Sequence, residues 1–427
     1  MEWERRFLET LHASRPSYDE PPDWRAALAF YDADPDERLL LAMIDEEYRN
    51  PFSSRENLPF DDVMVNLPAG MAPDDLLSIE AAVMIAAERG LGVALFAFNR
   101  LMRSPRWHPL SARLFWLNTA AGDVQRKLMA TTAGRFLGAM LGLACGDALG
   151  VTLEFQTRSE IRRKYPDGHR EISGGGPFGF AAGEWSDDTA MALAVARGIL
   201  ESPGDPVEPV GRHFQDWYGS HPPDVGTTCR RSLETHRRLG SWEATTREVE
   251  RQLGTRAAGN GALMRTLPAA LVYGPDPGPA VRIARMTHPH HESDAAVAVY
   301  QLMVDALLQG PDKTAAFAAG LTAAGPLKER LQRVPAMKEA EVRSTGYVVD
   351  TLEAAIWCFL TTQTLEECLV RAANLGDDAD TVAAVAGGLA GSAYGAAAIP
   401  RRWSLALKNR SELETVAERL YLTSNRR

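Results

Sequence analysis

GRFLGAMLGLACGDALG, residues 134–150, has a glycine at every fourth position. Residues four apart lie on one face of a helix, so these glycines form a single stripe of minimal side-chain bulk. Each glycine costs a helix about 1 kcal/mol relative to alanine, and the repetition therefore calls for a compensating gain. Close backbone approach between two buried helices supplies that gain. Gly387, Gly391 and Gly395 repeat the spacing and predict a second helix of this kind.

Small residues four apart also mark helix packing within membranes, so a membrane protein is the alternative to consider. Residues 381–400 are uncharged, but they are mostly Ala and Gly and only weakly apolar. Asp147 interrupts the first glycine run close to its end. Period-2 patterns rich in β-branched residues, the signal of strands, are nearly absent. We therefore predict an all-α protein with buried helices and no membrane span.

The chain has 427 residues, which exceeds the size at which a single core usually keeps growing. We predict a small helical N-terminal domain over residues 1–127, followed by a compact multi-helix domain over residues 128–427. The N-terminal segment is richer in Trp and Pro than the remainder. Its amphipathic patterns predict helices at Trp24–Ala33, Glu37–Tyr48, Asp75–Glu88, Leu91–Met102 and Leu110–Thr119.

Composition and charge limit the classes of function that the protein can have. The net charge of −10 argues against a non-specific nucleic-acid binder. The first residues lack the basic and apolar regions of a signal peptide. The four cysteines are far apart and form no CxxC pair, which predicts reduced thiols without a disulfide frame. We therefore expect a cytoplasmic protein.

Two short acidic clusters each precede an Ala-rich run with helical character. They are Ser186-Asp187-Asp188-Thr189 and Asp377-Asp378-Ala379-Asp380-Thr381. Carboxylates this close repel one another, and neither cluster has a Lys or Arg among its immediate neighbours. Asp, Ser and Thr are also common N-cap residues, so each cluster alone is compatible with a plain helix start. Two clusters, each richer in carboxylate than a cap requires, favour hard-cation binding through oxygen ligands.

Six motifs, in order along residues 128–427, make the chain similar to a known family. They are Gly142–Gly150 with Glu154-Phe155; Gly174–Phe178 leading into Gly183–Thr189; Pro223–Thr228; Gly259–Arg265; Thr287-His288-Pro289; and Asp378–Thr381. In these motifs the chain resembles the ADP-ribosylglycohydrolase family (dinitrogenase-reductase-activating glycohydrolase-like). The resemblance does not extend to residues 1–127, which match no family that we recognise.

The resemblance implies an all-α catalytic domain with two Mg²⁺ ions, for which Mn²⁺ sometimes substitutes. The implied metal ligands are Ser186, Asp187 and Asp188 in one half of the site, and Asp378, Asp380 and Thr381 in the other. Four carboxylates then supply four negative charges to two divalent ions. Ser186 stands where the family more usually has Thr, but it keeps the hydroxyl oxygen. Asp377 is not part of this implied ligand set, and we expect it to cap a helix or to contact one of the metal-binding residues.

The resemblance also implies contacts to the substrate, an α-linked ADP-ribose attached to a protein side chain or a small molecule. Glu154 matches the family's substrate-contacting glutamate, and Glu154 and Asp378 are the candidate catalytic residues. Spacing alone leaves open that Glu154 is a solvated carboxylate at a helix end. The candidate substrate-binding residues are Asp224, Gly226, Thr227, Gly259, Asn260, Gly261 and His288. The Gly259–Gly261 loop has little bulk and fits close approach to a diphosphate.

Two further interpretations concern a histidine-rich segment and Asp147, which lie in or next to these motifs. The spacing of His288, His290, His291 and Glu292 is not that of a zinc site. We interpret this segment as a surface loop in which His288 faces the substrate. Asp147 is interpreted as structural, tying down a turn between Gly146 and Gly150.

The leading hypothesis is a metal-dependent hydrolase that cleaves the glycosidic bond between ADP-ribose and a modified acceptor, with a protein side chain favoured as the acceptor. A hypothesis from another class is an immunity or binding protein whose residues 1–127 grip a partner such as an ADP-ribosyltransferase and block it. The full set of implied ligands argues against an inactive enzyme. The sequence does not identify the acceptor.

Overall fold

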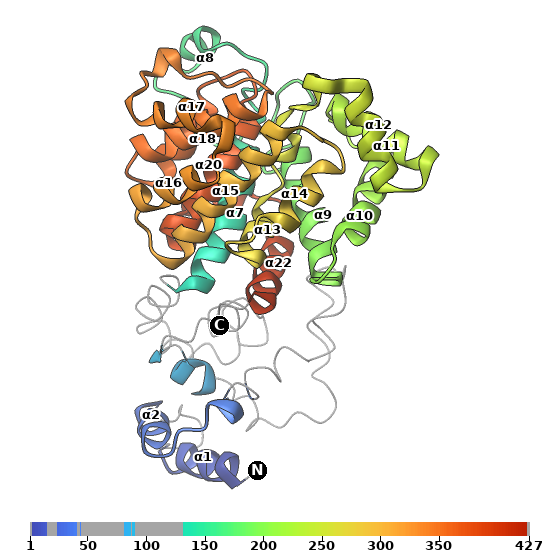
Figure 1. Ribbon diagram of the computed structural model, residues 1–427. Helices are drawn as coiled ribbons and strands as arrows, with labels where there is room; N and C mark the ends of the chain where they lie inside the picture. Colours follow the sequence, from blue (N-terminus) through green and yellow to red (C-terminus); the bar gives the residue numbers. More distant parts are fainter. Residues whose placement is uncertain are drawn as a thin grey trace. The chain divides into compact units, whose positions relative to one another are not determined.

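The computed structural model describes residues 2–14, 24–40, 43, 81–86, 88–89 and 131–424 (Figure 1). Contacts within the chain divide it into two compact units, Met1–Gly134 and Arg135–Arg427. Throughout the described ranges the regular structure is helical, and β pairing is limited to the isolated bridges Gly175–Phe180 and Gly259–Tyr347. The prediction of an all-α fold is confirmed.

The first unit contains α1 (Glu2–Ala13) and α2 (Trp24–Ala33), which pack through aromatic rings. The ring of Trp3 stacks on Phe7 at 5.2 Å and meets the edge of Phe30 at 5.3 Å. The bounds of α2 are those predicted. Of the other predicted helices, Leu91–Met102 and Leu110–Thr119 lie outside the described residues, and Glu37–Tyr48 and Asp75–Glu88 lie partly outside them.

The helices from residue 132 onward surround a core rich in Ala, Leu and Val. They are α7 (Thr132–Gly150), α8 (Arg158–Lys164), α9 (Asp187–Glu201), α10 (Val207–Gly219), α11 (Thr227–Leu239), α12 (Trp242–Leu253), α13 (Leu267–Tyr273), α14 (Gly278–Arg285), α15 (His291–Gln309), α16 (Lys313–Thr322), α17 (Lys328–Gln332), α18 (Val348–Thr361), α19 (Leu365–Ala373), α20 (Ala379–Tyr394), α21 (Arg401–Ala406) and α22 (Arg410–Thr423). Short 3₁₀ turns lie between them: η3 (Gly254–Ala257), η4 (Asn260–Ala262), η5 (Gly325–Leu327), η6 (Val334–Ala336), η7 (Glu339–Glu341) and η8 (Ala396–Ala398). Among the helices described, none is long and apolar enough to cross a membrane.

The two glycine-bearing helices, α7 and α20, run antiparallel against each other at backbone distance. A Cβ added at Gly142 would overlap the carbonyl of Gly387, and one added at Gly387 would overlap the carbonyl of Gly142. At the end of α7, a Cβ on Gly150 would overlap the backbone of Asp380. The close approach predicted from the glycine spacing is confirmed. It also brings the C-terminal end of α7 to the N-terminal end of α20, where the acidic cluster begins.

The Gly142→Ala variant should be destabilised by about 2–3 kcal/mol or more, because the added methyl group meets backbone that cannot move aside. Thermal unfolding monitored by circular dichroism would measure this as a lower melting temperature. Gly204→Ala is the matched control, since a Cβ at Gly204 meets nothing within 4 Å. Equal melting temperatures for the two variants would contradict the tight α7–α20 contact.

Candidate metal centre

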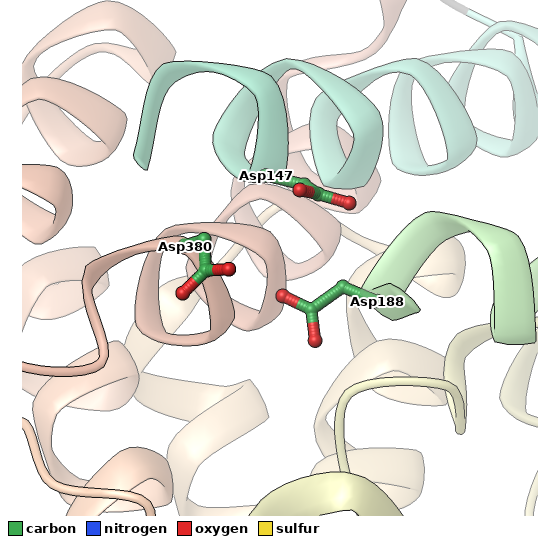
Figure 2. Close-up of side chains that lie close together, drawn as sticks. All are labelled: Asp147, Asp188 and Asp380. Carbon is green, nitrogen blue, oxygen red and sulfur yellow. The ribbon is translucent and has the colours of Figure 1, made fainter. Parts of the chain in front are cut away.

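Three buried aspartates from three helices converge at the end of α7. They are Asp147 of α7, Asp188 of α9 and Asp380 of α20, and their side chains point toward one another (Figure 2). Each offers a carboxylate oxygen, and these three oxygens lie within 4.8 Å of one another. Asp147 and Asp188 are fully buried, and Asp380 is 2% exposed. Because like charges at this distance repel in a buried site, the group requires protons or cations.

Asp147 is anchored by hydrogen bonds from the start of α9. Its Oδ1 accepts from the backbone N–H of Ser186 at 2.9 Å. Its Oδ2 accepts from the backbone N–H and the hydroxyl of Thr189, at 2.9 and 2.6 Å. Asp147 therefore binds first-turn donors of α9 from a neighbouring helix. The predicted turn between Gly146 and Gly150 is wrong, because α7 continues through Gly150.

A second carboxylate group adjoins the first through Asp380. Glu154, Asp224 and Asp380 offer oxygens that also lie within 4.8 Å of one another. Glu154 follows α7 and is 6% exposed, so the reading of a solvated helix-end carboxylate is wrong. Asp224, which we expected only to line the substrate cleft, lies within the carboxylate group itself and is half-buried. Among the residues that the structure describes, these two sets are the His, Cys, Asp and Glu groups able to hold a metal ion.

The remaining predicted ligands lie beside these groups. Ser186 is the N-cap of α9, and its hydroxyl accepts from the N–H of Asp188 at 3.3 Å. The hydroxyl of Thr381 donates to Asp188 Oδ1 at 3.2 Å, which links the two acidic clusters directly. The carboxyl groups of Asp187 and Asp224 lie close enough to share a proton. Asp378 occupies the N-cap position of α20, and its Oδ2 accepts from Asn260 Nδ2 at 3.0 Å.

Asp377 stands apart from this centre. Its side chain is exposed, and its φ of +54° lies in the left-handed region. Its backbone pairs with Phe155 and Gln156, at 2.7 and 2.9 Å. It does not cap α20, because Asp378 holds the N-cap position. The structure assigns Asp377 a backbone connection to the segment that carries Glu154.

Burial and mutual repulsion perturb the whole carboxylate set. Burial, with the charges of Asp224 and Asp378, raises the pKa of Glu154 to about 8. Burial and Asp378 raise the pKa of Asp224 to about 6. Burial first, and the neighbouring carboxylates second, hold the pKa values of Asp187, Asp188 and Asp380 well above their ordinary range. Such shifts are typical of functional sites in which the charged forms need a partner.

Three oxygens in this centre are buried and have no hydrogen-bond partner. They are Glu154 Oε2, Asp188 Oδ2 and Asp380 Oδ1. Buried carboxylate oxygens are costly unless they are paired or coordinate a metal. A set made of carboxylate and hydroxyl oxygens is the kind that hard divalent cations prefer. The residues present therefore fit a divalent metal ion.

The Gly259–Gly261 loop is adjacent to the carboxylates, and Asn260 connects the two. Its Nδ2 donates to Asp378 and also to Thr351 Oγ1 at 3.0 Å, so this amide group is already engaged within the protein. Gly226 is the exposed N-cap of α11, and Thr227 is the first residue of that helix. Both are positioned close in sequence to Asp224.

His288 does not lie in a surface loop, so that prediction is wrong. Its side chain is 3% exposed and packs beneath the Gly259–Gly261 loop. Burial, with the charge of Arg265, lowers the pKa of His288 well below its ordinary value and keeps the ring neutral. Further along, His290 is the N-cap of α15 and accepts from the N–H of Glu292 at 3.3 Å.

Asp147 and Asp224 were not predicted from the sequence as members of the carboxylate groups. One signal for Asp147 was available: a lone charged residue within a Gly/Ala-rich helix is costly to bury without a purpose. The sequence around Asp224 has no comparable signal, because the carboxylates that it meets in space lie far from it in the sequence.

Fold and site together define an all-α protein with a buried oxygen-donor centre that is suited to divalent cations. Comparison with known proteins then identifies the family. Residues 128–427 match the family model for ADP-ribosylglycohydrolase, and the chain belongs to that family. It is an ADP-ribosyl glycohydrolase, a hydrolase that acts on glycosyl bonds.

Individual relatives agree with this assignment. The ADP-ribosyl-(dinitrogen reductase) glycohydrolase of Rhodospirillum rubrum is 38% identical over 287 residues, which cover 66% of this chain and 92% of the relative. The ADP-ribosylarginine hydrolase Tri1 of Serratia proteamaculans is 33% identical over 323 residues, covering 72% and 83%. A solved structure, described as an ADP-ribosylglycohydrolase-related protein complex, matches with a TM-score of 0.58 at 36% identity, covering 69% of this chain and 99% of that one.

Proposed function

We propose that this protein is a metal-dependent hydrolase that removes ADP-ribose from a modified protein side chain. The observation that carries the metal dependence is the pair of buried, unpartnered carboxylate oxygens on Asp188 and Asp380. Burying such oxygens without a partner costs free energy, and a bound divalent cation would remove that cost by pairing with them.

Two Mg²⁺ ions are the proposed cofactor, with Mn²⁺ as a substitute. The residues proposed to hold them are Ser186, Asp187, Asp188, Asp378, Asp380 and Thr381. Asp224 is added to this set because its carboxylate lies within 4.8 Å of those of Glu154 and Asp380. When bound, the ions would orient the ribose hydroxyls and polarise the attacking water. Asp147 holds the start of α9 in place, and with it the orientation of Asp188.

Glu154 is proposed as the carboxyl group that exchanges a proton during cleavage of the glycosidic bond. Glycoside cleavage uses a carboxyl group with a raised pKa beside the scissile bond. In the metal-free protein the pKa of Glu154 is raised to about 8, and its buried Oε2 has no hydrogen-bond partner that would compete for a proton. Asp378 is proposed to act beside it, with its carboxylate oriented by Asn260.

The Gly259–Gly261 loop and His288 are proposed to bind the diphosphate, with Asp224, Gly226 and Thr227 along the same cleft. Because the Asn260 amide is engaged with Asp378, the loop would contact the diphosphate through its backbone. Glycine allows a phosphate to approach backbone N–H groups closely.

The acceptor is proposed to be an ADP-ribosylated protein side chain, with arginine favoured. Support comes from the names of two relatives, one an ADP-ribosylarginine hydrolase and the other acting on ADP-ribosylated dinitrogen reductase. The test is release of ADP-ribose from a panel of proteins modified on arginine, serine or acidic side chains, with Mg²⁺ and with excess chelator. We expect Mg²⁺-dependent release from arginine. Full release in chelator would contradict the metal dependence, and release from another acceptor alone would contradict the arginine assignment.

The metal-free protein should lose stability as the pH rises from about 4 to about 8. Folding raises the pKa of Glu154 to about 8 and of Asp224 to about 6, above their ordinary values near 4. The folded state therefore holds protons on these two carboxyl groups more tightly than the unfolded state does. The resulting stabilisation is complete at low pH and is lost as the pH rises through the raised pKa values. Mg²⁺ competes with these protons, so the stabilisation that it confers should grow over the same window.

Melting temperatures at pH 6 and pH 8, each with chelator and with Mg²⁺, would measure both effects. A Mg²⁺ concentration of about 100 times Kd should add about 2.7 kcal/mol. An increase in melting temperature that is the same at both pH values would show that proton release from these carboxyl groups is not linked to metal binding.

A further inference from the structure

Arg265 is fully buried, yet its hydrogen bonds reach no carboxylate. Its Nη2 donates to Thr287 Oγ1 at 2.5 Å and to the carbonyl of Ile283 at 3.5 Å. Its Nη1 has the sulfur atoms of Cys229 and Met191 as weak acceptors, at 3.6 and 3.7 Å, and the guanidinium lies over the ring of Phe214. A buried guanidinium that is hydrogen-bonded to no carboxylate is costly, and an apolar side chain would fill the same space without that cost. The proposed function so far gives Arg265 no role.

Thr287 connects Arg265 to His288. The Thr287 hydroxyl oxygen lies 2.8 Å from His288 Nδ1. A guanidinium can only donate, so Thr287 Oγ1 accepts from Arg265 and keeps its own proton available. The adjacent positive charge polarises the hydroxyl and makes it a better donor. The arrangement therefore favours donation from Thr287 to Nδ1, which leaves the proton of the neutral imidazole on Nε2.

The imidazole edge that carries Nε2 lies against the two glycines on either side of Asn260. A Cβ on Gly261 would lie 2.7 Å from His288 Cε1 and 3.1 Å from Nε2. A Cβ on Gly259 would lie 3.2 Å from Cδ2 and from Nε2. The ring thus occupies the space that a side chain at position 261 would need, and it leaves little room for one at position 259. A proton on Nε2 is consequently presented at the loop rather than toward the core.

We propose that Arg265 is a positioning residue, which acts through Thr287 to hold His288 in the Nε2–H tautomer. His288 then presents a fixed hydrogen-bond donor beside the Gly259–Gly261 loop for the diphosphate of ADP-ribose. The proposal rests on the proposed function in one respect, namely that this loop binds the diphosphate. A donor of fixed tautomer needs no rearrangement when the anion arrives, which is the advantage of preorganisation.

The tautomer can be read directly from long-range ¹⁵N–¹H NMR spectra of the full chain labelled on histidine, in which His288→Gln identifies the signal. We expect the wild type to have the proton on Nε2 alone. Thr287→Val keeps the shape but removes the hydroxyl, so both tautomers should be populated. Affinity for free ADP-ribose, measured by calorimetry with Mg²⁺, should fall about tenfold in this variant. Thr287→Ser should restore both readouts.

Two further variants separate this role from packing. Arg265→Met fills the space without hydrogen-bond donors and should reproduce the effect of Thr287→Val. The double variant should lose little further ADP-ribose affinity, because both residues act through one contact. Thr246→Val is the control, since the hydroxyl of Thr246 donates to the carbonyl of Arg285 away from this network. A wild-type proton on Nδ1 would overturn the proposal, as would unchanged ADP-ribose affinity in Thr287→Val. If the wild type does not bind ADP-ribose, the proposed function fails, and the NMR result on the tautomer is unaffected by that failure.

Discussion

Asp380→Asn should lower kcat/KM for release of ADP-ribose by about 10³-fold or more. Asp380 is the residue shared by the two carboxylate groups, so its neutralisation weakens both. A metal ion that stabilises the transition state contributes several kcal/mol, and about 4 kcal/mol corresponds to a thousandfold change in rate. Steady-state release of ADP-ribose from an arginine-modified protein, at saturating Mg²⁺, would measure the loss.

The chain offers a matched control three residues earlier. Asp377→Asn makes the same chemical change at an exposed side chain outside both groups, and asparagine tolerates the left-handed backbone there. Its activity should stay within about twofold of wild type. Without metal, Asp380→Asn should melt no lower than wild type, because the substitution relieves like-charge repulsion. Its stabilisation by Mg²⁺ should be much smaller. Full activity in Asp380→Asn would refute the metal centre.

Glu154→Gln should lower kcat by about 10²–10⁴-fold, the usual contribution of a general acid or base. The substitution keeps the shape of the side chain and removes the proton that it exchanges. In contrast to Asp380→Asn, stabilisation by Mg²⁺ should persist, because the proposed aspartate ligands are unchanged. Single-turnover kinetics combined with melting temperatures would distinguish the two effects.

The control for this variant is Glu208→Gln, at an exposed glutamate in the first turn of α10. We expect it to match wild type in turnover and in stability. Turnover of Glu154→Gln within a factor of about two of wild type, at saturating substrate, would assign Glu154 a structural role only. Loss of the Mg²⁺ effect together with turnover would instead place Glu154 among the metal ligands.

Much of the helical core could be predicted because its signals are local. The glycine stripe of residues 134–150 predicted a backbone contact, and Gly142 and Gly387 make it. The acidic clusters predicted helix starts, and α9 and α20 begin at them. The segment before residue 128 offered weaker patterns, of which α2 is described with the bounds predicted. The proposal that this segment binds a partner stays a prediction.

The burial and partners of single side chains could not be predicted in the same way. His288 was assigned to a surface loop, yet its side chain is buried against the Gly259–Gly261 loop. Asp224 was assigned to the cleft wall, yet it joins Glu154 and Asp380. Both outcomes depend on segments distant in the sequence, whose contacts leave no periodic pattern along the chain.

By itself, the sequence determined that the chain is helical, that two of its helices meet through glycine, and where carboxylates gather along the chain. These properties follow from helical periodicity and from the repulsion between neighbouring charges, which act over a few residues. Only the tertiary structure decided which carboxylates share a site. Asp188 and Thr381 are 193 residues apart and meet because α7 carries Asp147 to the ends of both α9 and α20. Electrostatic coupling depends on distance in space and on burial, and both are set by helix packing.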